Sequence, residues 1–393
     1  MIKQISLLFL MVSLLSCKPK DTAELNPIQS DFTLDMEAIS DKMIDLSDLK
    51  ADEKVLLVMA PGDFNGIIDP LKTAIEKKNA VYLGTMSVTD DQPKEWTTTW
   101  VSERLDKSDE DLRSSFEEVD LGIMLPGSTP SHQPYKVLQN MLEGTSRRTI
   151  HFHWAGVYDL NGNLLETDEK KSQFYQNVIL NTDYQALGEA QSIFEEAMRN
   201  NQIRVSTPEG TDIQFEIGER PVTKQDGNAS KTRASQGLNL IDREIEIPAG
   251  AIRVAPIEES VNGTIAFPDA LWDGSLVEGL KVTIESGKII DVQATNGKES
   301  VLSEMEKSGE AGRSFREFAL GFNPLMPIQN DDVPWIPYYG YGAGVVRLSL
   351  GDNTELGGKV GGGFVRWNFF PNATVVVGDE VWVDNGVLIR DIQ

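Results

Sequence analysis

The alternation of strands and helices that the sequence predicts stops near residue 200. Between residues 55 and 154, short apolar runs that end in Gly or Pro turns alternate with amphipathic helical segments. Such alternation is typical of a small, mostly parallel sheet flanked by helices. The first run, Val55–Ala60, is apolar throughout, as expected of a strand that is buried on both faces. We therefore expect an α/β domain with an open sheet over residues 51–200.

Two helices of this domain are predicted from their end residues and their periodicity. Asp69 followed by Pro70 is typical of an N-cap and a first helical position, and predicts a helix that runs to about Lys78. Apolar residues recur with a helical period from Asp183 to Met198. This second helix is expected to connect the α/β domain to the domain that follows it.

Beyond residue 203 the helical patterns nearly disappear, except for one segment at Ser300–Ser308. Short strands separated by Gly, Asn and Asp turns replace them. This pattern predicts a mostly antiparallel, β-rich domain over residues 201–393. The expected fold class is therefore α+β with two domains, a small N-terminal α/β open sheet and a C-terminal antiparallel β domain.

Two apolar strand-like runs of the β-rich domain each carry a single charge. Arg347 lies within Val345–Leu350, and Arg366 lies within Phe364–Phe370. A charge in an apolar strand is costly to bury unless a partner compensates it. The two arginines therefore either lie on solvated strand faces or meet a buried partner of opposite charge.

The N-terminus has the pattern of an exported bacterial lipoprotein. Residues 1–16 combine Lys3 with an apolar run that is too short to span a bilayer, which is typical of a signal peptide. Cys17, the only cysteine, follows Leu-Leu-Ser in the manner of a lipobox. We therefore expect a lipidated Cys17, a tether over residues 17–50 whose second part forms a short helix, and an extracytoplasmic location at the bacterial cell envelope.

Charge and cysteine content exclude some classes of function. The formal net charge of −25 repels phosphate backbones, so we expect no nucleic-acid partner. Contact with the membrane is expected through the N-terminal lipid alone. With a single cysteine, an intrachain disulfide is not possible.

Several phrases of the β-rich domain together resemble the aminopeptidase T family of dinuclear metallopeptidases. Their order and spacing match that family, and so does the α/β domain that precedes them. Among the phrases, in chain order, are Gly210-Thr211-Asp212-Ile213, Ile247-Pro248-Ala249-Gly250-Ala251, Ser260-Val261-Asn262-Gly263, Glu317-Phe318-Ala319-Leu320-Gly321-Phe322-Asn323 and Leu350-Gly351-Asp352-Asn353. The resemblance implies the family's two-domain fold, a leucyl-type aminopeptidase activity with two metal ions, and a homodimer.

The metal ligands that this resemblance implies are mostly replaced in the chain. A family Glu falls on Ala251, a second is kept as Glu317, and a family His falls on Arg347. The last His-x-Asp pair falls on Arg366 and Asn368, and the remaining acidic ligand has no counterpart.

The nitrogen ligands that such metals favour are also missing from this part of the chain. From residue 154 to residue 393 there is neither His nor Cys. Arginine cannot replace them, because its guanidinium stays protonated and offers only donors. We therefore expect no metal, no cofactor and no catalytic residue at this site.

Two interpretations of Glu317, Arg347 and Arg366 stay open at this stage. The three side chains could form a buried carboxylate–guanidinium cluster that only holds the strands together. Alternatively, the two arginines could exceed what one carboxylate satisfies and so bind a peptide, a phosphate or a small carboxylate. Aromatic residues around Tyr338–Tyr341 and Trp367 would line such a pocket or pack in the core.

The histidines before the β-rich domain give a weaker signal. His151 and His153 would face the same side of a strand and could reach one metal, but hydrogen bonding at a strand end explains them better. Neither Ser128 nor Ser131 lies in a nucleophile elbow.

Three functions therefore remain. The first is a non-catalytic envelope lipoprotein that binds a peptide or another anionic ligand. The second is an active leucyl-type metalloaminopeptidase with a rearranged site. The third is a structural or assembly subunit.

Overall fold

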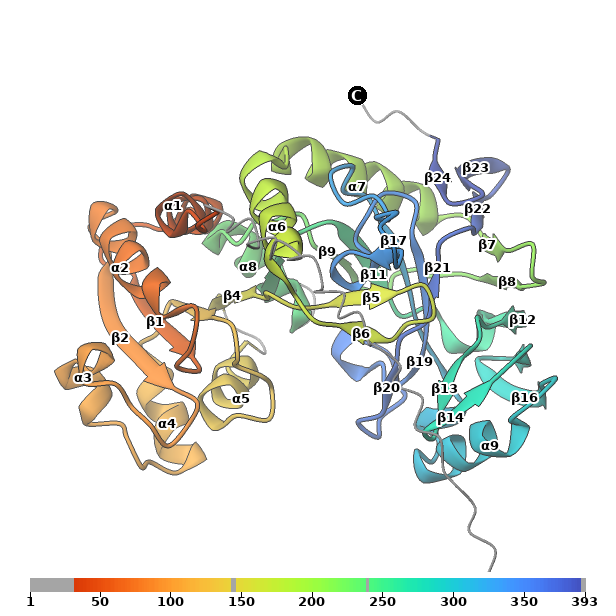
Figure 1. Cartoon of the computed structure of the whole chain (residues 1–393), viewed down its shortest axis with the longest axis horizontal. Coiled ribbons are helices and arrows are strands. Elements are labelled where there is room, and N and C mark those ends of the chain that lie inside the picture. The colour runs from red at the N-terminus through yellow and green to blue at the C-terminus, as the bar shows by residue number, and fades with distance from the viewer. Residues whose placement is uncertain (1–31, 143–145, 238–239, 390–393) are drawn as a thin grey trace, which may run out of the picture. The chain divides into compact units, whose positions relative to one another are not determined.

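A five-stranded parallel sheet forms the first layer of the fold (Figure 1). The structure, a computed structural model, describes residues 32–142, 146–237 and 240–389, and the chain from Leu34 onward forms one compact unit. The strands, in spatial order, are β10 (Glu244–Ile247), β4 (Arg148–Phe152), β3 (Leu121–Met124), β1 (Lys54–Met59) and β2 (Val81–Ser87). All four pairings are parallel, as the alternating sequence pattern predicts.

Helices cover both faces of this sheet, because successive residues of a strand point to opposite sides. Leu57 of β1 packs with one set of helices and Leu56 with the other. The first set is α1 (Met36–Leu46), α2 (Ile68–Lys77) and α6 (Glu169–Asn181), and the second is α3 (Thr99–Ser102), α4 (Asp109–Phe116) and α5 (Gln133–Asn140).

The start of α2 differs from the sequence prediction. A 3₁₀ turn at Asn65–Ile67 runs directly into the helix, so the helix begins at Ile68 and its N-cap is Ile67. Asp69 therefore lies inside the first turn, where its charge still complements the helix dipole.

The short helix expected in the tether is α1, and it belongs to the folded unit. Asp35 caps its N-terminus by accepting a hydrogen bond from the backbone of Ala38. Ile39, Met43 and Ile44 are buried in the core beneath the parallel sheet. The fold thus begins well before position 50, where the sequence prediction ended the tether, whereas Cys17 lies outside the described residues.

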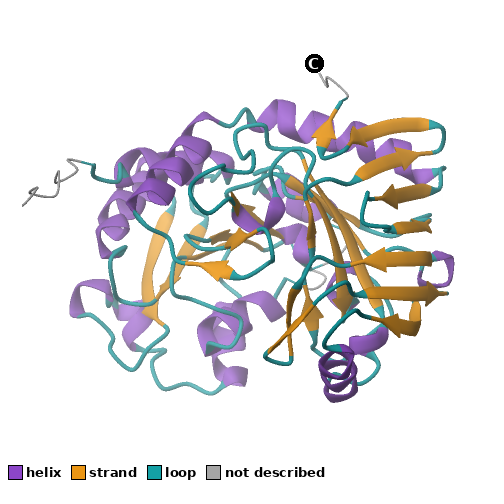
Figure 2. Ribbon diagram, turned by 45° about the vertical axis from the view of Figure 1, so that its right-hand side comes forward, coloured by secondary structure: helices purple, strands orange, loops and turns teal. Residues whose placement is uncertain are grey.

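The rest of the chain is mostly antiparallel strand, as predicted (Figure 2). A six-stranded sheet contains β9 (Val222–Lys224), β11 (Ala251–Val254), β17 (Phe315–Gly321), β19 (Val346–Gly351), β20 (Val365–Arg366) and β21 (Phe369–Phe370). An eight-stranded sheet contains β16 (Lys288–Gln293), β15 (Lys281–Glu285), β12 (Asn262–Ala266), β8 (Asp212–Phe215), β7 (Ile203–Ser206), β22 (Thr374–Val377), β23 (Glu380–Asp384) and β24 (Val387–Leu388). The connecting helix α7 (Tyr184–Arg199) packs into the buried core that both sheets share, through Phe194 against Phe318 and Trp382.

Smaller elements complete the fold. They are α8 (Lys231–Gln236), α9 (Lys298–Lys307), the hairpin of β13 (Ala270–Trp272) and β14 (Ser275–Val277), and the sheet of β5 (Val157–Asp159), β6 (Leu164–Leu165) and β18 (Trp335–Ile336). The helix α9 confirms the segment predicted near Ser300–Ser308.

One strand returns from the β-rich part of the chain to the parallel sheet. β10 follows β9 and α8 in sequence but pairs with β4, so that Glu246 lies beside His151. Within the three described ranges of the chain, no helix has the length and apolar character needed to cross a membrane.

Candidate functional site

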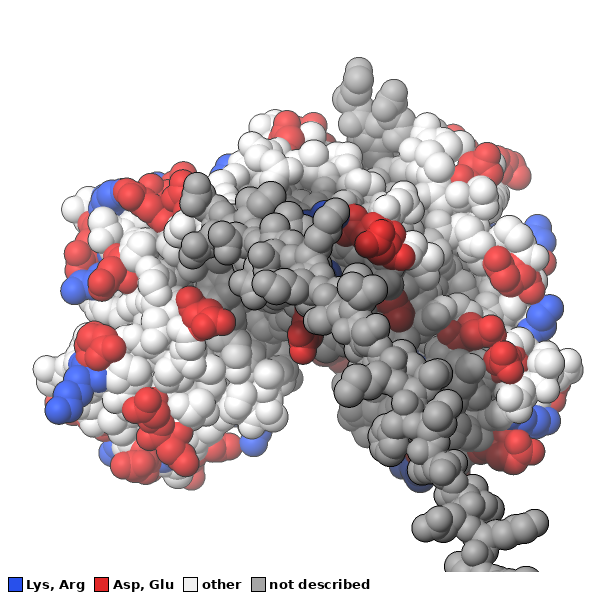
Figure 3. Space-filling view, in the orientation of Figure 1, with Lys and Arg blue, Asp and Glu red and all other residues white. Residues whose placement is uncertain are grey.

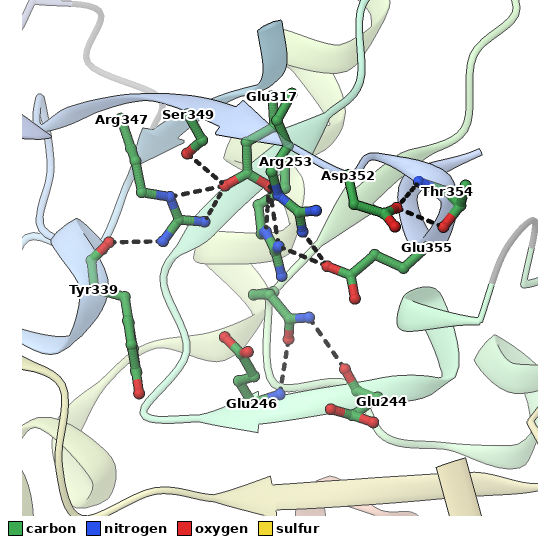
Figure 4. Close-up of polar contacts among 12 residues, drawn as sticks. Glu244, Glu246, Arg253, Glu317, Tyr339, Arg347, Ser349, Asp352, Thr354 and Glu355 are labelled. Carbon is green, nitrogen blue, oxygen red and sulfur yellow. Dashed lines mark hydrogen bonds and ion pairs between the residues drawn. The ribbon is translucent and has the colours of Figure 1, made fainter. Parts of the chain in front are cut away.

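Three neighbouring strands of the six-stranded sheet, β11, β17 and β19, place charged side chains on one face. Arg253 of β11 lies opposite Ala319 of β17, which in turn lies opposite Arg347 of β19. Glu317 is two residues from Ala319 and lies opposite Ser349. Because residues two apart on a strand face the same side, Arg253, Glu317 and Arg347 converge there (Figure 4).

The carboxylate of Glu317 is the centre of this group and is fully buried. Its Oε1 accepts hydrogen bonds from Arg347 Nε at 2.9 Å and from Ser349 Oγ at 3.3 Å, and Arg347 Nη2 lies 2.8 Å away. Its Oε2 accepts hydrogen bonds from Arg253 Nη2 at 3.0 Å and Arg253 Nε at 3.3 Å. Arg316 Nε lies 3.7 Å from the same oxygen. A single carboxylate thus faces three guanidinium groups.

These guanidiniums determine the protonation of Glu317. Burial by itself raises the pKa of the carboxyl, but the charges of Arg253, Arg347 and Arg316 together hold that pKa far below its usual range. Glu317 is therefore a carboxylate at every physiological pH.

A second carboxylate, Glu355, closes the group on its solvent side. It belongs to the 3₁₀ turn η7 (Thr354–Leu356), and it accepts a hydrogen bond from Arg316 Nη2 and lies 3.5 Å from Arg253 Nη2. Its side chain is 39% exposed, whereas the side chains of Arg253 and Arg316 are 5% and 2% exposed. We name Arg253, Arg316, Glu317, Arg347 and Glu355 the charge cluster.

Aromatic side chains surround the other end of Arg347. Its Nη1 donates a hydrogen bond to the backbone oxygen of Tyr339 at 3.0 Å. The guanidinium carbon lies 5.4 Å from the ring centroid of Trp367 and 5.9 Å from that of Tyr341. The hydroxyl of Tyr341 donates a hydrogen bond to Glu246. Burial raises the pKa of this carboxyl, although the charges of Arg253 and Arg347 oppose the shift.

Arg366 does not belong to the charge cluster, so the prediction that it lies beside Glu317 is wrong. Arg366 lies opposite Leu350, which faces the core side of the sheet, whereas Glu317 lies opposite Ser349 on the other side. Arg366 Nη1 donates to Glu304 at 2.7 Å and Nη2 donates to the backbone oxygen of Leu271 at 2.8 Å.

The other two positions that the resemblance singled out have backbone and packing roles. Asn368 is buried, and its Nδ2 donates to the backbone oxygens of Leu348 at 3.2 Å and Arg366 at 3.4 Å. Ala251 is fully buried on the same strand as Arg253 and offers no polar side chain.

Sequence reasoning missed Arg253, Arg316 and Glu355. Arg253 carries the same signal that marked Arg347, a lone arginine in a short apolar strand, and Arg316 directly precedes Glu317. Glu355 carries no local signal, because it meets the arginines only through the fold of its loop.

A second polar group lies where β4 and β10 meet. Nδ1 of His151 is 2.9 Å from the hydroxyl of Tyr135 and 2.8 Å from Nε2 of His153. The same hydroxyl donates to Glu244 at 3.1 Å. Burial lowers the pKa of His151 to about 3 and that of His153 well below its ordinary value, so both imidazoles are neutral. This arrangement is the hydrogen-bonded strand end that the sequence favours over a metal site.

The loop after β3 turns the chain beside these histidines. A cavity of about 80 Å³ is lined by Ser128, His151 and His153, among others. The hydroxyl of Ser128 donates to the backbone oxygen of Leu125 at 2.6 Å. This bond fixes the turn and does not pair the serine with a base.

The residues of the charge cluster do not fit the pair of metal ions that the aminopeptidase T resemblance implies. Arg253 and Arg347 present only donors and positive charge to the position that Glu317 faces. Among the described residues, no group of three or more His, Cys, Asp or Glu side chains is placed to hold a metal ion. Zinc and similar ions prefer sites with several such ligands, including nitrogen.

Comparison with known proteins identifies the scaffold that carries the cluster. A family model described as thermophilic metalloprotease (M29) matches residues 181–335. Wild-type AmpT from Thermus thermophilus shares 16% sequence identity and a TM-score of 0.57 with the chain, over 90% of this chain and 99% of that chain. The resemblance to the aminopeptidase T family is confirmed.

The aminopeptidase T-like fold is also found in a protein named as a dioxygenase. The structure of 2,5-dihydroxypyridine dioxygenase from Pseudomonas putida KT2440 matches with 16% identity and a TM-score of 0.62, over 91% of this chain and 98% of that chain. A comparison with curated proteins gave no match. At 16% identity these two similarities concern the fold alone, and the chemistry of this site depends on its own residues.

Proposed function

We propose that the protein is a non-catalytic envelope lipoprotein that uses the charge cluster to bind a peptide or another anionic ligand through its carboxylate. The aminopeptidase T-like scaffold supplies the site, and guanidinium groups stand where the resemblance places metal ligands. Without a metal-binding set, the site lacks the ions that polarise a carbonyl and activate water in a dinuclear metallopeptidase.

The observation that carries this proposal is the imbalance of charge. Three buried guanidiniums meet two carboxylates, Glu317 and Glu355, of which only Glu317 is fully buried. Glu317 and Glu355 are shared among the three guanidiniums, so one positive charge has no carboxylate of its own. Burying an uncompensated charge is costly, so such a site favours an additional anion. The next carboxyl, Glu246, accepts a hydrogen bond from Tyr341, and burial raises its pKa although the charges of Arg253 and Arg347 oppose the shift.

The surroundings favour an organic carboxylate over a phosphorylated polymer. Trp367 and Tyr339 lie beside Arg347, and the exposed face of Trp367 can pack against a side chain or a carbon skeleton. On the face drawn in Figure 3, Asp and Glu side chains are spread over the described surface with Lys and Arg between them. Such a surface repels polyanions and admits a small ligand with one or two charges.

Isothermal titration tests the proposal. We expect the purified protein to bind succinate or a short peptide with a free C-terminus, and Arg347→Ala to abolish that binding. Arg204→Ala is the matched control, because Arg204 forms an exposed pair with Asp212 in the eight-stranded sheet, whereas Arg253, Glu317 and Arg347 lie in the six-stranded sheet. Equal binding by wild-type protein and Arg347→Ala would reject the anion site.

Elemental analysis and aminopeptidase assays test the alternative of an active enzyme. We expect no stoichiometric metal and no turnover of leucyl substrates with added zinc, cobalt or manganese. Bound metal together with turnover that Glu317→Gln abolishes would establish the enzyme. If the protein is inactive and binds no anion, the cluster is structural and the protein an assembly subunit.

The location at the envelope and the homodimer are also proposals. They rest on the signal-peptide pattern, on Cys17 and on the family resemblance. Membrane fractionation of wild-type protein against Cys17→Ser tests the lipid anchor, since the variant should leave the membrane fraction. Light scattering of the protein without its first 16 residues tests the dimer.

A further inference from the structure

We infer that Glu355 occupies the position beside Arg316 and Arg253 where the carboxylate of a ligand binds, which we call the seat. A free carboxylate binds there by displacing the Glu355 side chain from the two arginines. The inference rests on the proposed function, and it names both the ligand group and the place where it binds. Glu355 is then an internal carboxylate that keeps the seat filled when no ligand is present.

The exposure of the cluster points to Glu355 as the entrance. Glu317, Arg316 and Arg253 are almost completely buried, whereas 39% of the Glu355 side chain is exposed. Glu355, which lies against Arg253 in Figure 4, is therefore the member of the charge cluster that solvent reaches most. A ligand that reaches Arg316 or Arg253 from this side has to replace it.

The backbone around Glu355 is held, so only its side chain needs to move. The preceding Asn353 is buried, donates to Glu258 at 3.2 Å and accepts a hydrogen bond from the backbone of Val360 at 2.8 Å. The following Leu356 is fully buried. Rotation about the side-chain bonds of Glu355 opens the seat and leaves this loop in place.

Glu355 satisfies the guanidinium edge of Arg316 incompletely. Oε1 of Glu355 accepts from Nη2 of Arg316, but the buried Nε of Arg316 makes no hydrogen bond and lies 3.7 Å from Oε2 of Glu317. The Nε–H and Nη2–H bonds leave the same edge of a guanidinium and match the two oxygens of one carboxylate. A carboxylate that is not tied to the loop can accept both bonds, which gives it an advantage over Glu355.

The charges predict which ligand end binds. When Glu355 swings out, Glu317 is the carboxylate of the charge cluster that remains paired with Arg253, Arg316 and Arg347. This excess of positive charge favours a carboxylate over its neutral amide. The ligand class is therefore a molecule with a free carboxylate, such as a peptide C-terminus or a small dicarboxylate.

Titration of wild-type protein and its variants with four probes tests the inference. Wild-type protein, Glu355→Gln and Glu259→Gln are each titrated with succinate, succinamate, the dipeptide Leu-Leu and its C-terminal amide. Glu259 is the matched control, because its carboxylate forms an exposed pair with Lys359 in the same region of the chain. We expect Glu355→Gln to lower the Kd for carboxylate probes about tenfold or more, since a neutral amide competes for Arg316 and Arg253 less strongly than a carboxylate does.

The pattern across probes and variants decides the outcome. Leu-Leu binding with loss on amidation assigns the seat to peptide ends, whereas succinate binding alone assigns it to dicarboxylates. Glu355→Asp, which keeps the charge but shortens the side chain, should bind with intermediate affinity. Adding Arg316→Met to Glu355→Gln should abolish the gain.

Two results would overturn the inference in different ways. If wild-type protein binds carboxylates and Glu355→Gln binds them equally or more weakly, Glu355 is not a displaced ligand mimic, although the anion site stands. If no variant binds any probe, the proposed function fails as well. Circular dichroism and a melting curve on each variant separate loss of binding from loss of the fold.

Discussion

Replacement of Glu317 by Gln is the strongest test of the charge cluster. The amide keeps the shape of the side chain but removes the one fully buried negative charge among three guanidiniums. Removing one partner of a buried ion pair typically costs about 3–5 kcal/mol of unfolding free energy. Because Glu355 is partly exposed and touches only two of the arginines, it cannot take over this role. We therefore expect Glu317→Gln to lose about 3–5 kcal/mol.

Urea unfolding followed by tryptophan fluorescence measures this loss. Glu259→Gln serves as the control and should leave the unfolding midpoint unchanged, because its pair with Lys359 is exposed. A second variant, Glu317→Gln with Arg347→Met, removes one positive charge as well. It should be more stable than Glu317→Gln alone, and the double-mutant cycle should give a coupling energy of about 1–3 kcal/mol between the two side chains. A loss below about 1 kcal/mol in the single variant would refute the account, because that is the scale of an exposed ion pair.

Two further predictions follow from the same contacts. The stability that Glu317 contributes is complete above the pKa of an unfolded glutamate, and it decreases as the pH falls toward the lowered pKa of the folded state. The difference in unfolding free energy between wild-type protein and Glu317→Gln should therefore shrink progressively below about pH 4.3. Urea unfolding at pH 7 and at pH 3.5 checks this prediction, and a constant difference would contradict it. Arg366→Ala should lose about 1–3 kcal/mol through its pairs with Glu304 and the backbone of Leu271, while its Kd for succinate stays at the wild-type value, and a weakened Kd would place Arg366 in the anion site after all.

Local patterns account for much of the fold. The apolar run at Val55–Ala60 and the helical period of Asp183–Met198 each reflect burial within one element, and both elements form as predicted. The strand β10 escaped prediction, because four residues of alternating Glu and Ile carry little signal and their partner β4 lies far earlier in the chain. The start of α2 shifted because the preceding 3₁₀ turn, not Asp69, sets its first turn.

The site residues, too, could be predicted only where the local sequence carries the signal. Glu317 and Arg347 were predicted as partners and do meet. Arg366 was assigned to the same group, but the side to which a strand residue points depends on the pairing register, which the sequence alone does not reveal. The residue next to it, Trp367, is the one that lies over Arg347. Arg253 could have been found by applying to its strand the reasoning that singled out Arg347.

The return of β10 to the edge of the parallel sheet has a consequence for biosynthesis. A ribosome makes the strands β1 to β4 in order, but the neighbour of β4 is translated only after α7 and several further strands have emerged. Until then β4 presents an unpaired edge, the kind of surface through which nascent chains associate with one another. A fragment that stops at residue 200 would keep this edge permanently, so we expect it to aggregate, while a fragment that extends past Ile247 can close it.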